Sequence, residues 1–340
     1  MLPLKHEPNN FDFLRLTAAM LVLYSHQFAL LGQSETGIVP TVSWGSLGVY
    51  IFFTISGYLV TQSWTRAPNA CEFITRRFLR IWPGLFAMTC LLALVIGPLV
   101  STLSYWDYFQ SAQTYDFFSI LKLNIQYYLP GVFSTNTYPN AVNGSLWTIP
   151  IEINFYAMLL IAGIVRLLNF KWAILTGLIA IAIYHFGVCQ AGTNASHNYF
   201  IEFGLYFIYG VVMQLFRPIW AHQTAKGYIA VGAMAIIFCF TGHAIIGLWI
   251  ALPYLVIAFG AASTPVVRRF GRFGDISYGV YIYAFPMQQL IIHFSAGRLT
   301  LPVCLLLSMT ATAVCAFASW HWVEKPAMQF KPKSTLVAAE

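Results

Sequence analysis

Long apolar runs recur along the whole chain at nearly regular intervals, separated by short polar segments. Each run is close to the roughly 20 residues that a helix needs to cross a bilayer. The short alternating segments of a membrane β-barrel are absent, and a helix satisfies its backbone hydrogen bonds internally even in lipid. The pattern therefore predicts an all-α bundle of about ten transmembrane helices, at residues 11–31, 44–64, 82–102, 150–167, 171–189, 198–216, 226–243, 245–262, 276–296 and 299–322.

The composition supports lipid as the main solvent of this chain. Hydrophobic residues make up 59% of the sequence and charged residues 9%, whereas soluble domains carry roughly a quarter charged residues. With no low-complexity stretch or obvious repeat, we expect a single membrane domain over residues 1–340 that ends in a short disordered tail from about 327 to 340. The longest segment between spans, 103–149, is rich in polar and aromatic residues, so we expect part of it to lie along the membrane surface and roof a site.

The net charge of +7 is informative through its distribution. If the N-terminus is cytoplasmic, two basic residues fall on the outer side, Lys122 and Arg298. The cytoplasmic side holds Lys5, Arg66, Arg76, Arg77, Arg80, Arg166, Lys171, Arg217, Lys226, Arg268, Arg269, Arg272, Lys325, Lys331 and Lys333. This asymmetry predicts an even number of spans with both termini cytoplasmic, and it explains the basic charge without a nucleic-acid partner. The six cysteines have no Cys-x-x-Cys spacing, so neither a disulfide framework nor a metal site is expected.

Two ionisable residues lie inside the first predicted span, where such groups are costly and often functional. His26 follows Arg15 by eleven residues, so the two share a helix face with a rise of about 16 Å between them. Histidine is the usual general base at neutral pH. The alternatives are that Arg15 reaches the membrane surface and pairs with Asp12, and that His26 only bonds a neighbouring helix.

Glu152 is the second costly residue, in the segment NGSLWTIPIEINFY that starts at Asn143. We expect Ser145 to cap the helix, with Pro150 in an early turn, which puts Glu152 in the outer half at a depth similar to that of His26. A carboxylate there could orient and stabilise an imidazolium. The alternative is a buried acid bonded to a Tyr or Trp. No Gly-x-Ser-x-Gly elbow surrounds Ser145, so capping is favoured over a nucleophilic role.

The third cluster is the run RRFLRIWP, in which Arg76, Arg77 and Arg80 precede the third predicted span. Guanidinium groups bind phosphate oxygens in two-point contacts, although arginines at this place also serve to fix topology. Arg268, Arg269 and Arg272 form a weaker cluster for which topology is favoured. The arrangement suits an elongated ligand, since the pantetheine arm of coenzyme A is on the order of 15–20 Å long, close to the rise along the first helix.

These motifs together resemble acyltransferase family 3, the bacterial membrane O-acyltransferases of surface polysaccharides and lipopolysaccharide. FDFLR with His26 is similar to the family's Arg-(ten residues)-His signature, and GVYIFFTISGYL at 48–59 to its second-helix motif. The arginine run, the segment from Ser145 to Tyr156, ISYGVYIY at 276–283 and the closing Glu-x-Pro at 324–326 follow in the family's order. Many members carry a His where this chain has Ala284, and Gln288 and Gln289 are the expected polar substitutes.

The resemblance implies transfer of an acyl group, most simply acetyl, from cytoplasmic acyl-CoA to a hydroxyl of an extracytoplasmic glycan or lipid-linked glycan. It places the enzyme in the bacterial cytoplasmic (inner) membrane. His26 and Glu152 are the expected catalytic residues, with direct attack favoured over an acyl-enzyme intermediate. Arg15 and the arginine run would hold the donor; the residues expected at the substrate are Ser145, Trp147, Tyr156, Tyr281 and Gln288. The alternatives are a transporter or flippase, and an acyltransferase that acts on a lipid or small metabolite.

Overall fold

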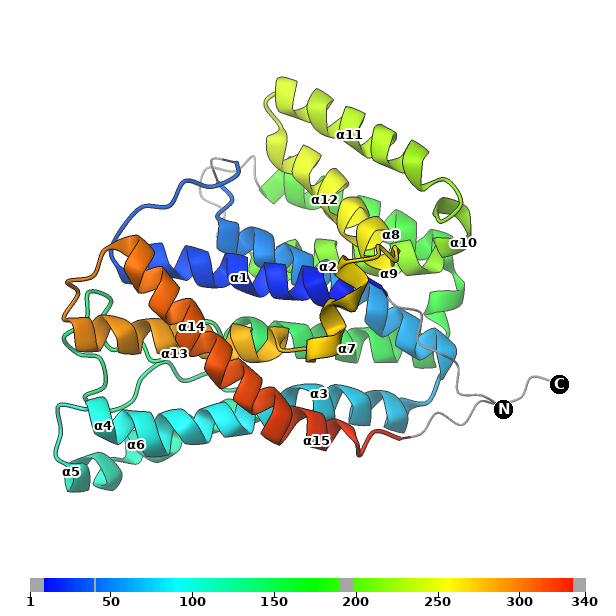
Figure 1. Cartoon of the computed structure of the whole chain (residues 1–340). Coiled ribbons are helices and arrows are strands. Elements are labelled where there is room, and N and C mark those ends of the chain that lie inside the picture. The colour runs from blue at the N-terminus through cyan, green and yellow to red at the C-terminus, as the bar shows by residue number, and fades with distance from the viewer. Residues whose placement is uncertain (1–8, 40, 190–197, 333–340) are drawn as a thin grey trace.

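The structure is a computed structural model that describes residues 9–39, 41–189 and 198–332. Within them all regular secondary structure is helical (Figure 1), which confirms the predicted all-α class. The longer helices are α1 (Phe11–Leu30), α2 (Trp44–Arg66), α3 (Ala70–Cys90), α7 (Thr148–Ile164), α8 (Lys171–Tyr184), α9 (Tyr199–Leu215), α11 (Thr224–Phe240), α12 (Ala244–Ala261), α13 (Ser277–Ser295) and α14 (Leu301–Ser319). Each predicted span overlaps one of them.

Shorter helical segments extend or connect these helices. They are η1 (Leu91–Ile96), α4 (Gly97–Val100), α5 (Tyr105–Gln110), α6 (Ala112–Asp116), η2 (Phe117–Lys122), η3 (Leu167–Asn169), η4 (His185–Cys189), α10 (Arg217–Trp220), η5 (Val267–Phe273), η6 (Trp320–Glu324) and α15 (Lys325–Met328). The tail predicted to be disordered from about 327 thus begins with the last two residues of α15, and its residues 333–340 lie outside the described ranges.

Among the residues that the structure describes, five continuous helical stretches are long and apolar enough to cross a membrane. They are Phe11–Leu30, Trp44–Arg66, Ala70–Val100, Ala244–Ala261 and Leu301–Met328. Four shorter apolar helices accompany them, at Thr148–Ile164, Lys171–Gly187, Tyr199–Leu215 and Thr224–Phe240. The chain is therefore built as a multi-pass membrane protein, while ten crossings stay a prediction.

The third long helix begins twelve residues before its predicted start at residue 82. Asn69 caps it, its side chain accepting a hydrogen bond from the Glu72 N–H at 3.0 Å. The apolar criterion missed this start because charged residues, Glu72, Arg76, Arg77 and Arg80, interrupt the apolar ones in the first three turns. Arg76 and Arg80 therefore lie within α3 instead of in the connection that precedes it. At its other end α3 continues into the π-helical η1, and Pro98 follows. Proline has no backbone N–H to donate, and the π-helical turn accommodates the missing hydrogen bond.

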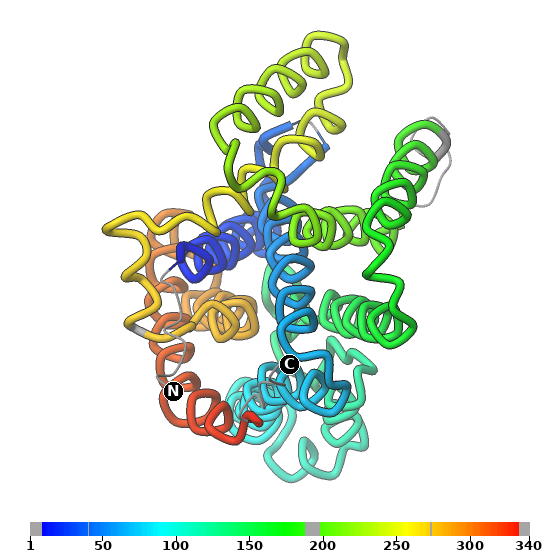
Figure 2. Tube along the Cα trace, turned by 90° about the vertical axis from the view of Figure 1, so that its right-hand side faces the viewer, coloured from blue at the N-terminus to red at the C-terminus, as the bar shows by residue number. Residues whose placement is uncertain are grey.

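Helix α2 lies in the middle of the bundle, packed against α1, α9, α12 and α7 (Figure 2). Its glycines allow close approach: a Cβ on Gly57 would meet the backbone of Phe207 in α9, and one on Gly48 would meet the carbonyl of Ala18 in α1. Small residues in α2 thus let its backbone approach those of α1 and α9 closely. The pair α11 and α12 projects from one side of the bundle, with α11 at its edge (Figures 1 and 2).

The segment between α4 and α7 divides into two parts. Trp106 and Tyr115 of the short helices α5 and α6 are well exposed, which is typical of aromatic residues at a membrane surface. Beyond η2 the chain returns into the bundle as irregular structure, and Phe133 is completely buried. The Asn143 Nδ2 atom donates to the Ile282 carbonyl oxygen of α13 at 2.9 Å. Helix α7 consequently begins inside the protein, since Ile149 at its start is 2% exposed.

Candidate functional site

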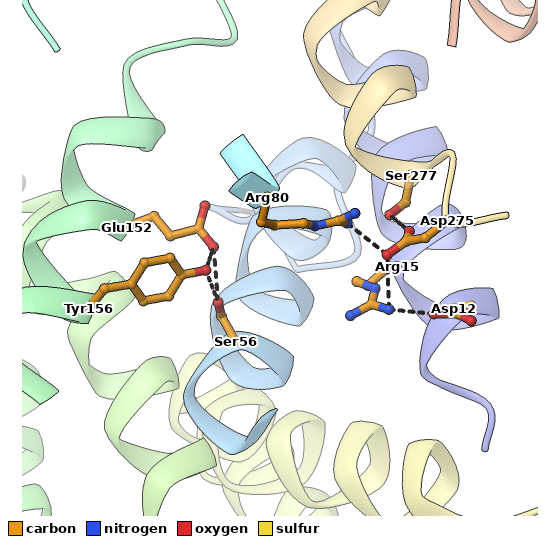
Figure 3. Close-up of polar contacts among 8 residues, drawn as sticks. All are labelled: Asp12, Arg15, Ser56, Arg80, Glu152, Tyr156, Asp275 and Ser277. Atoms are coloured by element: carbon orange, nitrogen blue, oxygen red, sulfur yellow. Dashed lines mark hydrogen bonds and ion pairs between the residues drawn. The ribbon is translucent and has the colours of Figure 1, made fainter. Parts of the chain in front are cut away.

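Arg15 takes part in an ion-pair network that joins three parts of the chain (Figure 3). It pairs with Asp12 of α1 and, at 3.1 Å, with Asp275, which precedes α13. Arg80 of α3 lies 2.7 Å from the same Asp275 carboxylate, and Ser277 Oγ donates to it at 2.6 Å. Burial alone would raise the pKa of Asp275, but the two guanidinium groups and Ser277 lower it to about 2. The predicted Arg15–Asp12 pair is confirmed.

Asp275 was missed by sequence reasoning. Its partners are hundreds of residues away in the sequence, and only its position just before the ISYGVYIY motif could have drawn attention to it.

Glu152 belongs to a second polar group, with Ser56 of α2 and Tyr156 of α7 (Figure 3). Ser56 Oγ donates to the carboxylate at 2.9 Å, and the Tyr156 hydroxyl also donates to it. The Arg77 guanidinium lies over the Tyr156 ring, 5.8 Å from its centre. Of the alternative, a buried acid bonded to a tyrosine, the structure contains the bond to Tyr156, while Glu152 itself is only partly buried.

The packing of α1 and α2 places this group at the Arg15 end of the bundle. The two helices are antiparallel, with Gly45 against Ser25 and Gly48 against Ala18 and Val22. Ser56 lies eight residues beyond Gly48, so it is near the start of α1. The expectation that Glu152 lies at the depth of His26 is wrong, because α7 starts within the bundle. Among the described residues, His26 is not a hydrogen-bond partner of Glu152.

The arginines of α3 have different partners. Arg76 pairs with Glu72 at 2.5 Å, whereas Arg80 pairs with Asp275. Arg77 makes no ion pair within the described residues, and its buried Nε has no hydrogen-bond partner there. Lys331, beyond α15, joins this cluster: burial, followed by the positive charges of Arg80 and Arg77, lowers its pKa to about 8. Its position in a polar tail gave no sign of this location.

His26 lies near the other end of α1, against α13. Its ring packs edge to face on Phe285, with 5.3 Å between ring centres. The Nδ1 atom is buried and has no hydrogen-bond partner in the described part of the chain. The Phe285 ring also covers Gly144, where an added Cβ would lie 2.6 Å from it. His26 and the segment Gly144–Ser145 therefore meet at the same aromatic ring.

Gln288, expected at the substrate, is fully buried and positions α13 against α1. Its Nε2 donates to the Leu23 carbonyl oxygen at 2.8 Å and to Gln27 Oε1 at 3.0 Å. Gln289 likewise bonds the irregular segment through Asn136 Nδ2, which donates to its Oε1 at 2.8 Å. Both amides thus bond within the protein, next to the His26 position.

Ser145 does not cap α7 as predicted, since that helix begins at Thr148 and no side chain caps it. The Ser145 carbonyl oxygen instead accepts from the Tyr281 hydroxyl at 2.7 Å, and Tyr281 also bonds Thr148 Oγ1 at 2.5 Å. The Ser145 hydroxyl is buried without a partner among the described residues. Trp147 packs on Tyr199, 4.9 Å between ring centres. Tyr281 therefore holds the start of α7 in place.

Known proteins resemble this chain over nearly its whole length. A family model described as an acyltransferase domain matches residues 9–321. An O-acetyl transferase of Shigella phage Sf6 is 31% identical over 333 residues, which cover 94% of this chain and 96% of that protein. Nodulation protein 10 of Rhizobium leguminosarum bv. viciae is 29% identical over 365 residues, covering 97% and 95% of the two chains. No solved structure matches.

Proposed function

Because the chain belongs to the acyltransferase family that its residues 9–321 match, we propose that it moves an acetyl group from acetyl-CoA to a sugar hydroxyl of a surface polysaccharide or lipopolysaccharide. The similarity to a protein named O-acetyl transferase favours acetyl as the acyl group. The acceptor meets the enzyme at the extracytoplasmic face of a bacterial cytoplasmic membrane, and both termini and the arginine cluster face the cytoplasm, which agrees with the distribution of basic residues.

The observation that carries the proposal is the buried, unpartnered nitrogen of His26. In the proposed step, His26 removes the proton from the acceptor hydroxyl as its oxygen attacks the thioester carbonyl carbon. A carbon–oxygen bond forms, and the carbonyl electron pair moves onto oxygen. When this pair returns, the carbon–sulfur bond breaks, and the CoA thiolate receives the proton from His26. No covalent acyl-enzyme is needed.

The donor's phosphates bind at the other end of α1. Arg77 and Lys331 make no ion pair there within the described ranges, and Arg15, Arg76 and Arg80 add positive charge around them. Guanidinium groups suit phosphate oxygens. The rise of about 16 Å from Arg15 to His26 is similar to the length of a pantetheine arm, so the thioester would reach the histidine. Glu152 acts at the donor-binding end, where it holds Tyr156 beneath Arg77, and it does not orient the imidazole of His26.

The test measures free CoA released from acetyl-CoA by purified protein in detergent, with and without glycan acceptor. We expect His26→Ala to lower the rate about 100-fold or more, the usual contribution of a general base. His243→Ala is the matched control, because His243 is exposed between α11 and α12, and it should keep the wild-type rate. A folded His26→Ala protein that acetylates at the wild-type rate would overturn the proposal. A wild-type protein that releases no CoA but moves glycan between vesicle leaflets would favour the transporter alternative.

A further inference from the structure

The start of α7 has the features of a site for negative charge inside the bundle. The helix is 17 residues long and no side chain caps its N-terminus. Within the described part of the chain, the Trp147 and Thr148 N–H groups have no hydrogen-bond acceptor. Such N–H groups and the aligned peptide dipoles give a helix N-terminus a partial positive charge that attracts anions.

The Ser145 hydroxyl is the independent sign of a ligand. Ser145 is 1% exposed, and its Oγ has no partner among the described residues. Buried hydroxyl groups are normally hydrogen-bonded, because leaving one unpaired costs free energy. The capping bond that would have satisfied it is not made, since its carbonyl is held by Tyr281 and the helix starts three residues later. The hydroxyl is thus a spare donor at the helix start.

Ser145 is next in the chain to a residue that shares an aromatic neighbour with the proposed base. The Phe285 ring contacts Gly144, the residue before Ser145, and the same ring packs on His26 at 5.3 Å between centres. Acyl transfer from a thioester places a base on the attacking oxygen and negative charge on the carbonyl oxygen in the same step. Donors fixed in a buried site stabilise that charge strongly, because the protein does not have to reorganise as it develops.

We propose that Ser145 Oγ and the free N–H groups at the start of α7 form the oxyanion site for the thioester carbonyl. This inference rests on the proposed acetyl transfer. As the acceptor oxygen bonds to the carbonyl carbon, the displaced electron pair resides on the carbonyl oxygen, and these donors bind it. When the carbon–sulfur bond breaks, the carbonyl re-forms and the donors release it. Ser145 keeps its proton throughout and forms no covalent bond.

The test compares Ser145→Ala with the wild type in the CoA-release assay. Loss of one oxyanion donor lowers kcat by about 100- to 1,000-fold, while the KM for acetyl-CoA stays within about twofold, because the donor acts only on the developing charge. Ser145→Cys, of similar size with a weaker donor, should give an intermediate kcat. Ser308→Ala, an equally buried serine of α14, is the control and should match the wild type.

Three results overturn the inference. The first is an unchanged kcat in Ser145→Ala, and the second is a change confined to KM. The third is an acetyl group found on Ser145 by mass spectrometry of wild-type protein incubated with acetyl-CoA alone, which would make the serine a nucleophile.

If wild-type protein releases no CoA, the proposed function fails and the inference fails with it. An active wild type with an equally active Ser145→Ala removes the oxyanion site alone. Should Ser145→Ala not fold, Ser145→Cys decides by the same split between kcat and KM.

Discussion

Replacement of Asp275 by asparagine tests the ion-pair network at the arginine end. The carboxylate lies 3.1 Å from Arg15 and 2.7 Å from Arg80, and it is mostly buried. Asparagine keeps the size and the hydrogen bond with Ser277 but removes the charge that separates two guanidinium groups. We therefore expect Asp275→Asn to destabilise the protein, because like charges then face each other across a mostly buried site.

The magnitude follows from the pKa of this group. A fall from 3.8 to about 2 corresponds to about 2.5 kcal/mol of stability at neutral pH. Unfolding entropy of roughly 2.1 cal/mol/K per residue gives about 0.7 kcal/mol/K for a chain of this length, so the midpoint should fall by about 3–4 °C. Because the folded pKa is depressed, this stability is present above about pH 4 and is lost as pH falls toward 2.

The assay is thermal unfolding in detergent at several pH values. The difference in unfolding midpoint between wild type and Asp275→Asn should be largest at pH 7 and about half as large at pH 3. Asp12→Asn is the control: Asp12 is more exposed and pairs with Arg15 alone in the described residues, so its loss should cost less than about 1 kcal/mol. A difference of about 1 °C in midpoint corresponds to about 0.7 kcal/mol. The reasoning is refuted if the midpoint of Asp275→Asn lies within about 1 °C of the wild-type midpoint at pH 7, or if the difference between the two midpoints does not shrink on acidification.

Three further predictions concern packing and donor binding. Gly57→Ala should lower the unfolding midpoint by about 1.5–4 °C, since its Cβ meets the Phe207 backbone and overpacking costs about 1–3 kcal/mol. Gly177→Ala, with open space around the Cβ, is the control, and equal midpoints would contradict the close α2–α9 contact. Arg77→Lys should raise the KM for acetyl-CoA about tenfold with little change in kcat, because lysine loses the planar fork; an unchanged KM argues against phosphate binding there. The KM of the wild type should rise as pH increases through about 8, where Lys331 loses its proton, and Lys331→Gln should abolish this rise; a rise that persists in the variant assigns it to another group.

The sequence predicted the helices well and the site unevenly, for physical reasons. Apolar runs mark helices because lipid or protein covers them, so all ten segments were found. The start of α3, capped by Asn69, was missed because charged residues interrupt the apolar pattern in its first turns. The depth of Glu152 was misjudged because a helix after a polar loop was assumed to start at the membrane surface. Asp275 was missed because its pairs depend on tertiary contacts. Arg15 and His26 could be singled out as candidates because an ionisable residue inside an apolar run is evident from the sequence alone.

The irregular segment that leads into α7 has a consequence for biosynthesis. Its amide groups are satisfied by a helix made much later, with Asn143 bonded to the Ile282 carbonyl and Asn136 to Gln289. Until α13 leaves the ribosome, these amides lack their oxygen acceptors on that helix, and lipid supplies none. A nascent chain that ends before residue 277 can hold its first helices in the membrane, yet the irregular segment that leads into α7 takes its final shape only when the last fifth of the protein has been inserted.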